Sequence, residues 1–331
     1  MKRVAPKALS EFDLIAKYFK PLTLGAPGAL ALSDDAAFIR PRAGYDLVVT
    51  VDAIVEGVHF LADDPACDIA QKALRVNISD LAAKGAQPKA YLLTAALPRH
   101  LDGTWMSSFA QGLKRSQKRY GIDLIGGDTV ATSGPLSLSI TAIGEVKAGQ
   151  MIRRAGAKIG DDVWVSGTIG DAGLGLAVAE CRLNSSIEKH ARFLIERYRV
   201  PQPRLEVGLG LHGLAHACLD VSDGLIADLG HLAAVSDVAI EVMAEHVPLS
   251  AAAQHFVRVD QISLESLLTV GDDYELAFAA APSDRARVGA LSARCKVPLA
   301  RIGCVSKGTG VTVVGEGGKV LQFSRTGFRH F

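Results

Sequence analysis

Short apolar runs rich in β-branched residues alternate with segments of helical periodicity along most of this chain, and this alternation is the strongest constraint on its fold. The run "YDLVVTVDAIV" is typical of a buried strand, and its end is expected near Asp52. Ser10 and Asp13 resemble a helix-capping pair, and Gly85 suits the end of a later helix. The other expected elements are helices over 11–20, 68–83 and 105–120 and strands over 89–97 and 137–146.

Length and local composition divide the chain into two domains. A chain of 331 residues exceeds the usual size of one compact core. The stretch "KAGQMIRRAGAKIGDD" concentrates Gly, Lys and Arg, as connections between domains do. After it, "DVWVSGTIGDAGLGLAVAE" and "ACLDVSDGLIADLGHLAAV" both have the order strand, turn, helix. The predicted fold is therefore α/β (α+β), with one domain over 1–148 and a second over 149–331.

Charge and cysteine content exclude several classes of protein. The chain has 36 basic and 35 acidic residues, so it offers no overall charge that would attract nucleic acid or an anionic membrane. No stretch approaches the roughly 20 apolar residues that cross a bilayer, and acidic residues interrupt what would be the core of a signal peptide. Five dispersed cysteines without a Cys-x-x-Cys pair argue against a zinc or disulfide framework. We expect a cytoplasmic protein.

The glycine-rich stretch "GTIGDAGLG" at 167–175 has two interpretations. It matches neither the P-loop pattern nor the dinucleotide-binding pattern. Such a stretch is either a tight strand-to-helix bend or a cradle for phosphate, and the bend is the more common case. If the protein uses a nucleotide, its phosphates must be held in another way.

Acidic residues recur at the ends of apolar runs, where α/β proteins place ligands. Taken alone, the pair Asp34–Asp35 is typical of a solvated turn. Asp80 lies in a helix, where it forms a polar stripe with Asn77 and Lys84 that could equally be a solvated face. The whole set of acidic residues indicates a cation site, because unpaired carboxylates that converge would repel one another without a bound cation. Its members are Asp34, Asp35, Asp52, Asp80, Asp128, Asp220, Asp223, Asp272 and Asp273.

The ligand type indicates which cation these carboxylates would bind. Carboxylates and hydroxyls without a Cys/His cluster are hard oxygen ligands that suit Mg²⁺ or Ca²⁺. No stretch has the EF-hand pattern, and Mg²⁺ is usually bound together with phosphates. The residues therefore predict a magnesium-dependent enzyme of phosphate chemistry that uses ATP.

At this point the order of the motifs resembles the thiamine-monophosphate kinase family, within the superfamily of aminoimidazole ribonucleotide synthetase and selenophosphate synthetase. The resemblance runs from about residue 11 to the C-terminus. It implies an N-terminal domain that binds Mg²⁺ and ATP and dimerises through its sheet, a C-terminal α/β domain, and ATP bound without a P-loop. It also implies transfer of phosphate from ATP to thiamine monophosphate, giving thiamine diphosphate. The motifs are "SDDAAFI", "TVDAIVEGVHF", "KALRVNISDLAAKGA", "LIGGDT", "RRAGAKIGDDVWVSGTIGDAGLGL", "DVSDGLIADLGHL", "VGDDYEL" and "GFRHF".

The resemblance assigns roles to individual residues. Asp52, Asp80 and Asp128 are expected to be catalytic through the metal ions they hold, and Val51 could be a ligand only through its carbonyl oxygen. Gly127, Arg154 and Ser222 are the expected ATP contacts, and a guanidinium suits phosphate oxygens. The ligands of several Mg²⁺ ions are expected to be Asp35, Thr50, Val51, Asp52, Asp80, Asp128, Asp220 and Asp223. Asp34 either shapes the turn or binds through water.

Substrate recognition is where the chain departs from its relatives. His59 matches a substrate contact, although a histidine beside a phenylalanine is also a common packed residue at a strand end. Asp272 stands where many relatives have Glu, so its side chain is one methylene shorter. Arg325 stands where some relatives have an aromatic residue that stacks on the substrate, and Phe323 or Phe328 could replace that residue.

Two other functions are compatible with the same residues. One is a superfamily relative that activates a different acceptor with ATP, although residues 33–37 lack the reactive cysteine of selenophosphate synthetases. The other is a regulatory protein that binds Mg²⁺ and nucleotide without turnover.

Overall fold

A computed structural model describes residues 11–183 and 187–328, and these form two compact units. The first unit contains the described residues up to 43, together with 49–77 and 88–143. The second contains 44–48, 78–87 and the described residues from 144 onward. Ser10 of the expected helix cap and the last three residues of the "GFRHF" motif lie outside the described residues. The expected domain boundary at residue 148 stays a prediction.

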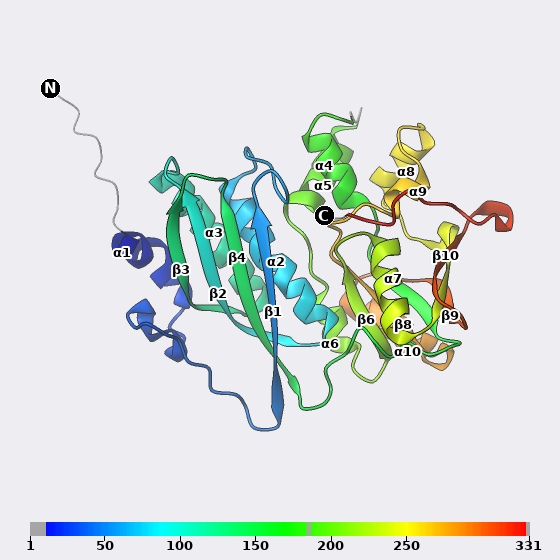
Figure 1. Ribbon diagram of the computed structural model, residues 1–331, viewed down its shortest axis with the longest axis horizontal. Coiled ribbons are helices and arrows are strands. Elements are labelled where there is room, and N and C mark those ends of the chain that lie inside the picture. Colours follow the sequence, from blue (N-terminus) through cyan, green and yellow to red (C-terminus); the bar gives the residue numbers. More distant parts are fainter. Residues whose placement is uncertain (1–10, 184–186, 329–331) are drawn as a thin grey trace. The chain divides into compact units, whose positions relative to one another are not determined.

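The first unit is built on a four-stranded sheet in the order β1-β4-β2-β3, with α2 and α3 against one face (Figure 1). β2 and β3 run parallel. Asp102 caps α3 by accepting the N–H of Trp105, and Gly121 ends it in a left-handed conformation. The elements over this part of the chain are α1 (Glu11–Leu14), η1 (Ile15–Phe19), η2 (Lys20–Thr23), η3 (Pro27–Leu32), β1 (Tyr45–Val55), α2 (Ala66–Ala83), β2 (Gln87–Pro98), α3 (Gly103–Tyr120), β3 (Asp123–Thr132) and β4 (Ser137–Lys147). The start of β1, the last turns of α2 and the end of β4 belong to the second unit.

The second unit contains a mixed six-stranded sheet in the order β10-β7-β9-β5-β8-β6. β8 is buried at every position, and α7 packs its apolar side chains into the main core of this unit. The elements are β5 (Asp162–Ser166), α4 (Asp171–Ala179), α5 (Glu188–Arg199), α6 (Leu205–Gly210), β6 (Ala215–Val221), α7 (Leu225–Ser236), β7 (Ala239–Met243), η4 (Ala244–His246), α8 (Ala251–Arg258), α9 (Leu264–Leu267), β8 (Glu275–Ala280), η5 (Pro282–Asp284), α10 (Arg285–Cys295), β9 (Leu299–Ser306), β10 (Gly310–Val314) and η6 (Glu316–Gly318).

The predicted fold class is confirmed, and most predicted elements lie within a few residues of their expected bounds. Three expectations need correction. The segment 11–20 is one turn of α-helix followed by a π-helix, and β3 was not predicted because Gly126 and Gly127 weaken its strand pattern. β1 extends to Val55 and is an edge strand rather than a buried one. Its apolar run is continuous, yet Val49 and Val51 are 60% and 62% exposed, because alternate side chains of β1 point to opposite faces of the sheet and these two lie on the exposed face.

Candidate active site

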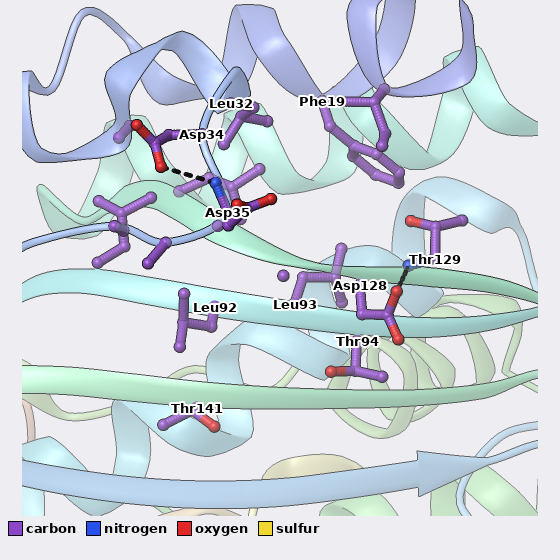
Figure 2. A pocket seen from close by; sticks show the side chains of 18 of the residues that line it. Phe19, Leu32, Asp34, Asp35, Leu92, Leu93, Thr94, Asp128, Thr129 and Thr141 are labelled. Atoms are coloured by element: carbon purple, nitrogen blue, oxygen red, sulfur yellow. Dashed lines mark hydrogen bonds between the residues drawn. The ribbon is translucent and has the colours of Figure 1, made fainter. Parts of the chain in front are cut away.

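A pocket of about 710 Å³ lies in the first unit, between the N-terminal helical turns and the sheet. Its apolar wall includes Phe19, Leu32 and Leu92. Its polar wall joins the segment after η3 to three strands of the sheet (Figure 2). The polar residues that line it are Asp34, Asp35, Thr94, Asp128, Thr129 and Thr141. Two of the predicted metal ligands, Asp35 and Asp128, therefore line the same cavity.

A hydrogen bond joins the two adjacent aspartates of "SDDA". The Asp34 carboxylate accepts the backbone N–H of Asp35 at 2.8 Å, so Asp34 shapes the turn (Figure 2). Across the pocket, Asp128 accepts the backbone N–H of Thr129, also at 2.8 Å. Gly127 precedes it with φ +150°, and a Cβ there would lie 1.9 Å from the Leu93 carbonyl oxygen. Only glycine lets β3 come this close to β2 at the pocket.

Thr50, Val51 and Asp52 follow one another on β1, so Thr50 and Asp52 point to one face and Val51 to the other. The backbone N–H of Asp52 donates to the Asn77 side-chain oxygen at 3.1 Å. Asn77 itself is completely buried, so the polar stripe on α2 is not a solvated face at this position. Its amide also donates to the Ala73 carbonyl. This pairing fixes the part of β1 that carries Asp52.

His59 lies in the turn after β1, and a hydrogen bond within this turn holds its ring. The Nδ1 atom accepts the backbone N–H of Val55 at 3.0 Å, which places the ring proton on Nε2. The His59 carbonyl accepts a hydrogen bond from the Lys72 ammonium at 2.7 Å. Any contact of this ring with a substrate would therefore use Nε2–H as a donor.

Asp80 and Asp220 form an acidic pair in the second unit. Burial raises the pKa of Asp220 above its usual value, and the negative charge of Asp80 raises it further. Lys84, one helical turn after Asp80, donates to the Cys218 carbonyl at 3.1 Å. Asp80 and Lys84 are both half-buried, so this end of the stripe is also not a solvated outer face. Two carboxylates whose charges disfavour each other are a natural site for a cation.

Arg154 is exposed on the segment that leads into β5. Its neighbour Arg153 accepts the backbone N–H of Cys218 at 2.9 Å through its carbonyl oxygen. The segment with Arg154 therefore runs along β6, the strand that carries Asp220.

The turn after β6 gathers several of the predicted contact residues. The Ser222 carbonyl accepts the backbone N–H of Asp272 at 2.8 Å, and the Asp223 carbonyl accepts that of Phe328 at 2.9 Å. Asp272 has φ +70°, an uncommon conformation for an aspartate. Phe328 keeps 48% of its surface exposed, whereas Phe323 packs against the main core. Of the two phenylalanines, Phe328 is thus the one placed beside Asp223; Arg325 is exposed.

The glycine-rich stretch is a bend whose N–H groups bind the protein's own carboxylate. Asp273 accepts the backbone N–H of Gly170 at 2.6 Å and that of Ala172 at 3.1 Å, at the N-terminus of α4. The N–H groups at a helix N-terminus need an acceptor, and the Asp273 carboxyl group supplies it from within the chain. Burial raises the pKa of Asp273 to about 8, while its hydrogen bond from Gly170 acts in the opposite direction. This geometry favours the bend over the phosphate cradle.

A buried ionic cluster supports this bend, and the sequence alone did not reveal it. Glu275 is completely buried, and it accepts hydrogen bonds from Arg197 at 2.9 Å and from Arg204 Nε at 2.6 Å. Ser166 also donates to it at 2.6 Å. The signal was present in "RYRVPQPR", where arginines flank a proline-rich connection, but nothing local showed that they point inward.

The carboxylates fall into small groups. Within the part of the chain that the structure describes, no three His, Cys, Asp or Glu side chains come close enough to hold a metal ion by themselves. Mg²⁺ commonly takes only one or two carboxylates, with waters and substrate phosphates completing its shell. The pocket carboxylates Asp35 and Asp128 and the pair Asp80–Asp220 fit that mode of binding, and all four are hard oxygen ligands.

Comparison with known proteins places this fold in a class. The N-terminal domain of AIR synthase related proteins matches residues 33–146, and the C-terminal domain of the same proteins matches residues 158–316. The chain is therefore a two-domain protein of the AIR synthase related class.

Sequence and structure comparisons narrow the class to one family. Thiamine-monophosphate kinase of Caulobacter vibrioides is 42% identical over 324 residues, which cover 97% of this chain and 91% of that protein. The crystal structure of the Stenotrophomonas maltophilia K279a enzyme has a TM-score of 0.84 at 42% identity, over 95% of this chain and 98% of that one. The structure of AaThiL complexed with AMPPCP and TMP has a TM-score of 0.78 at 31% identity and covers both chains completely. The chain belongs to the thiamine-monophosphate kinase family.

Proposed function

We propose that this chain transfers the γ-phosphate of ATP to thiamine monophosphate, giving thiamine diphosphate and ADP. The observation that carries the proposal is the full-length match to AaThiL, a protein solved with the ATP analogue AMPPCP and with TMP. The family match covers both domains, which supports an activity that needs both units. The reaction is that of an ATP-dependent phosphotransferase whose acceptor is a phosphate group.

The chemistry requires alignment more than proton transfer. The acceptor is a phosphate monoester, and its anionic oxygen attacks the γ-phosphorus of ATP directly. The bond between that phosphorus and the β,γ-bridging oxygen breaks, and ADP leaves with the electron pair. The task of the protein is to hold two anionic groups in line and to offset their repulsion. No phosphoenzyme is needed.

Bound Mg²⁺ would neutralise charge on both phosphate groups. Asp52, Asp80 and Asp128 are the ligands on which we expect catalysis to depend most. Asp52 is suited to this role because Asn77 fixes its backbone, and Asp80 because it adjoins Asp220. The full proposed ligand set is Asp35, Thr50, the carbonyl of Val51, Asp52, Asp80, Asp128, Asp220 and Asp223.

The remaining residues bind the two substrates. We assign ATP to Gly127, Arg154 and Ser222, of which Gly127 lines the pocket and Arg154 carries the positive charge. We assign thiamine monophosphate to His59, Asp272, Phe328 and Arg325. The backbone links of Asp272 to Ser222 and of Phe328 to Asp223 support a shared site for the two substrates.

The test is a product assay with three acceptor conditions. Purified protein is incubated with Mg²⁺-ATP and thiamine monophosphate, thiamine or no acceptor, and ADP and the thiamine product are identified by mass. We expect thiamine diphosphate from the monophosphate only, and no turnover when EDTA removes Mg²⁺. ATP binding without thiamine diphosphate would contradict the proposed acceptor.

We further propose that the chain is a homodimer that uses the exposed side of its first sheet. Val49 and Val51 expose large apolar surfaces at alternate positions of the edge strand β1. Exposed apolar strands of this kind are usually covered by a partner. Sedimentation should show a dimer at micromolar concentration, and Val49→Lys should yield monomer. Val235→Lys, at a valine 53% exposed on α7, is the matched control and should leave the dimer intact.

We also propose a cytoplasmic location. All five cysteines are free, and Cys181 and Cys304 are exposed, which suits a reducing compartment. None of the helices within the described ranges is long and apolar enough to cross a membrane. Fractionation of cells that produce the protein should recover it with cytoplasmic markers.

A further inference from the structure

The turn between β6 and α7 is held by one buried carboxylate. A single oxygen of Asp228 accepts the backbone N–H groups of Ser222 at 3.0 Å, Asp223 at 3.0 Å and Gly224 at 3.1 Å. Asp228 is 3% exposed and lies in the first turn of α7. A carboxylate there is also favoured by the positive end of the helix dipole. Three consecutive N–H groups of the turn thus share one acceptor.

The conformation of this turn needs such an acceptor. Gly224 has φ +128°, and a Cβ on it would lie 2.8 Å from the Thr269 carbonyl oxygen. The chain therefore turns sharply, and its N–H groups point inward to Asp228 instead of pairing with another strand. Without Asp228 the three N–H groups would lose their common partner, and the turn would lose the interaction that selects its shape.

The opposite side of the same turn fixes two other segments. Its carbonyl groups accept the N–H of Asp272 from Ser222 and the N–H of Phe328 from Asp223. Just before the turn, the Val221 carbonyl accepts the N–H of Tyr274 at 2.8 Å. The turn therefore donates hydrogen bonds to Asp228 on one side and accepts backbone hydrogen bonds from the segments of Asp272 and Phe328 on the other.

We propose that Asp228 is a positioning residue of the kinase. It holds the Ser222–Gly224 turn so that Ser222 and Asp223 are presented to the nucleotide and its metal in one arrangement. Through the two carbonyl groups it also sets the positions of Asp272 and Phe328. Asp228 acts through the backbone and does not touch the reacting atoms. The proposal rests on the proposed function, because it takes the roles of these four residues from it.

The experiment compares Asp228→Ala and Asp228→Asn with Asp162→Ala as a matched control. Asp162 is equally buried and pairs with Arg285 at 2.6 Å. Asp162 lies opposite Ala280 at one end of β8. Val221, which precedes the turn, lies opposite Glu275 at the other end, so the control residue is remote from the turn. The measurements are kcat, the KM for each substrate, thermal unfolding, and hydrogen–deuterium exchange of the 222–224 amides without substrate.

We expect Asp228→Ala to raise the KM for both substrates and to lower kcat/KM by about 10- to 100-fold, the scale of a small misplacement of contact groups. Exchange at residues 222–224 should accelerate, and exchange in β5 and β9 should not. Asp228→Asn keeps an acceptor oxygen and should recover most of the activity. Asp162→Ala should unfold at a lower temperature with unchanged KM values.

Three results would overturn the proposal: KM values of Asp228→Ala within twofold of wild type, equal kinetic losses in Asp228→Ala and Asp162→Ala, or an Asp228→Asn variant no better than alanine. If Asp228→Ala does not fold, Asp228→Glu replaces it, because the added methylene displaces the acceptor and should give the same pattern. If wild type forms no thiamine diphosphate, the proposed function fails. In that case the role of Asp228 is tested by comparing Asp228→Ala with wild type in amide exchange and in calorimetric ATP affinity. Unchanged exchange of the 222–224 amides would exclude the role.

Discussion

Asp273 and Gly170 stand 103 residues apart, and a hydrogen bond of 2.6 Å joins the carboxylate of one to the backbone N–H of the other. This bond explains why two adjacent aspartates of "GDDYE" differ. Asp273 is buried and anchors the start of α4, whereas Asp272 is partly exposed beside the Ser222 turn. The two aspartates do not form a pair of like charges at neutral pH, because burial raises the pKa of Asp273 to about 8.

The buried Asp273 predicts a pH dependence of stability. Its pKa is raised to about 8 in the folded state, mainly by burial, against an ordinary value of 3.8. Between these values the folded state binds more protons than the unfolded state, so the free energy of unfolding falls as pH rises, by up to ~1.4 kcal/mol per pH unit. This contribution is complete below about pH 4 and lost by about pH 8.

Urea unfolding of wild type and Asp273→Asn over this range measures the effect. Asparagine cannot ionise, so the stability of the variant should decline less steeply with rising pH. Taking the difference between the two curves removes the contribution of other shifted carboxylates. Parallel curves would show that Asp273 is ionised in the fold throughout.

Removing a proposed metal ligand should abolish turnover without unfolding the chain. Asp52→Asn and Asp80→Asn are each expected to lower kcat at saturating Mg²⁺ by ~100-fold or more. Asp80→Asn should not lower the thermal unfolding temperature, because it removes a charge that disfavours ionised Asp220. Asp63→Asn, at an exposed aspartate, is the control and should keep normal turnover. Near-normal kcat in either ligand variant would remove that residue from the metal site.

Gly127→Ala should be strongly destabilising. The new Cβ would meet the Leu93 carbonyl oxygen at 1.9 Å in a backbone conformation that side chains rarely adopt. We expect a loss of about 2–3 kcal/mol in the free energy of unfolding, measured with urea. Gly230→Ala is the matched control, because that glycine lies within α7 and a Cβ added to it would meet no atom within 4 Å. It should gain up to ~1 kcal/mol, and equal effects of the two changes would refute the packing argument at Gly127.

Variants of Phe328 and Arg325 test which of these two residues contacts the thiamine moiety of the acceptor. If the Phe328 ring contacts the thiamine moiety, Phe328→Ala should raise the KM for thiamine monophosphate by about tenfold and leave the KM for ATP unchanged. Stability should change little, because nearly half of the side chain is already exposed. Arg325→Ala should have the smaller effect on this KM. The reverse order would assign the contact to the position where some relatives carry an aromatic residue.

Local sequence patterns were sufficient to predict most of the helices and strands and the family. Helix α2 follows from apolar residues at helical spacing and from Gly85 after it, and β2 and β4 follow from their β-branched and apolar runs. The ordered motifs predicted the class that the comparisons confirm. These features are local in sequence, because helical and strand periods repeat within a few residues.

The tertiary structure alone decided what each carboxylate does and which strand is covered. In sequence, Asp273 looks like Asp272 and Asp228 looks like Asp223. Only the fold brings Gly170 to Asp273, across 103 residues, whereas Asp228 binds N–H groups that lie four to six residues before it. Burial in the fold makes both aspartates anchors. Likewise the apolar run of β1 is typical of a strand covered on both faces, but one face of its sheet is left open, so Val51 is exposed. The partner of Asp273, and the burial of both aspartates and of the β1 side chains, depend on residues far away in the chain, so a local pattern cannot determine them.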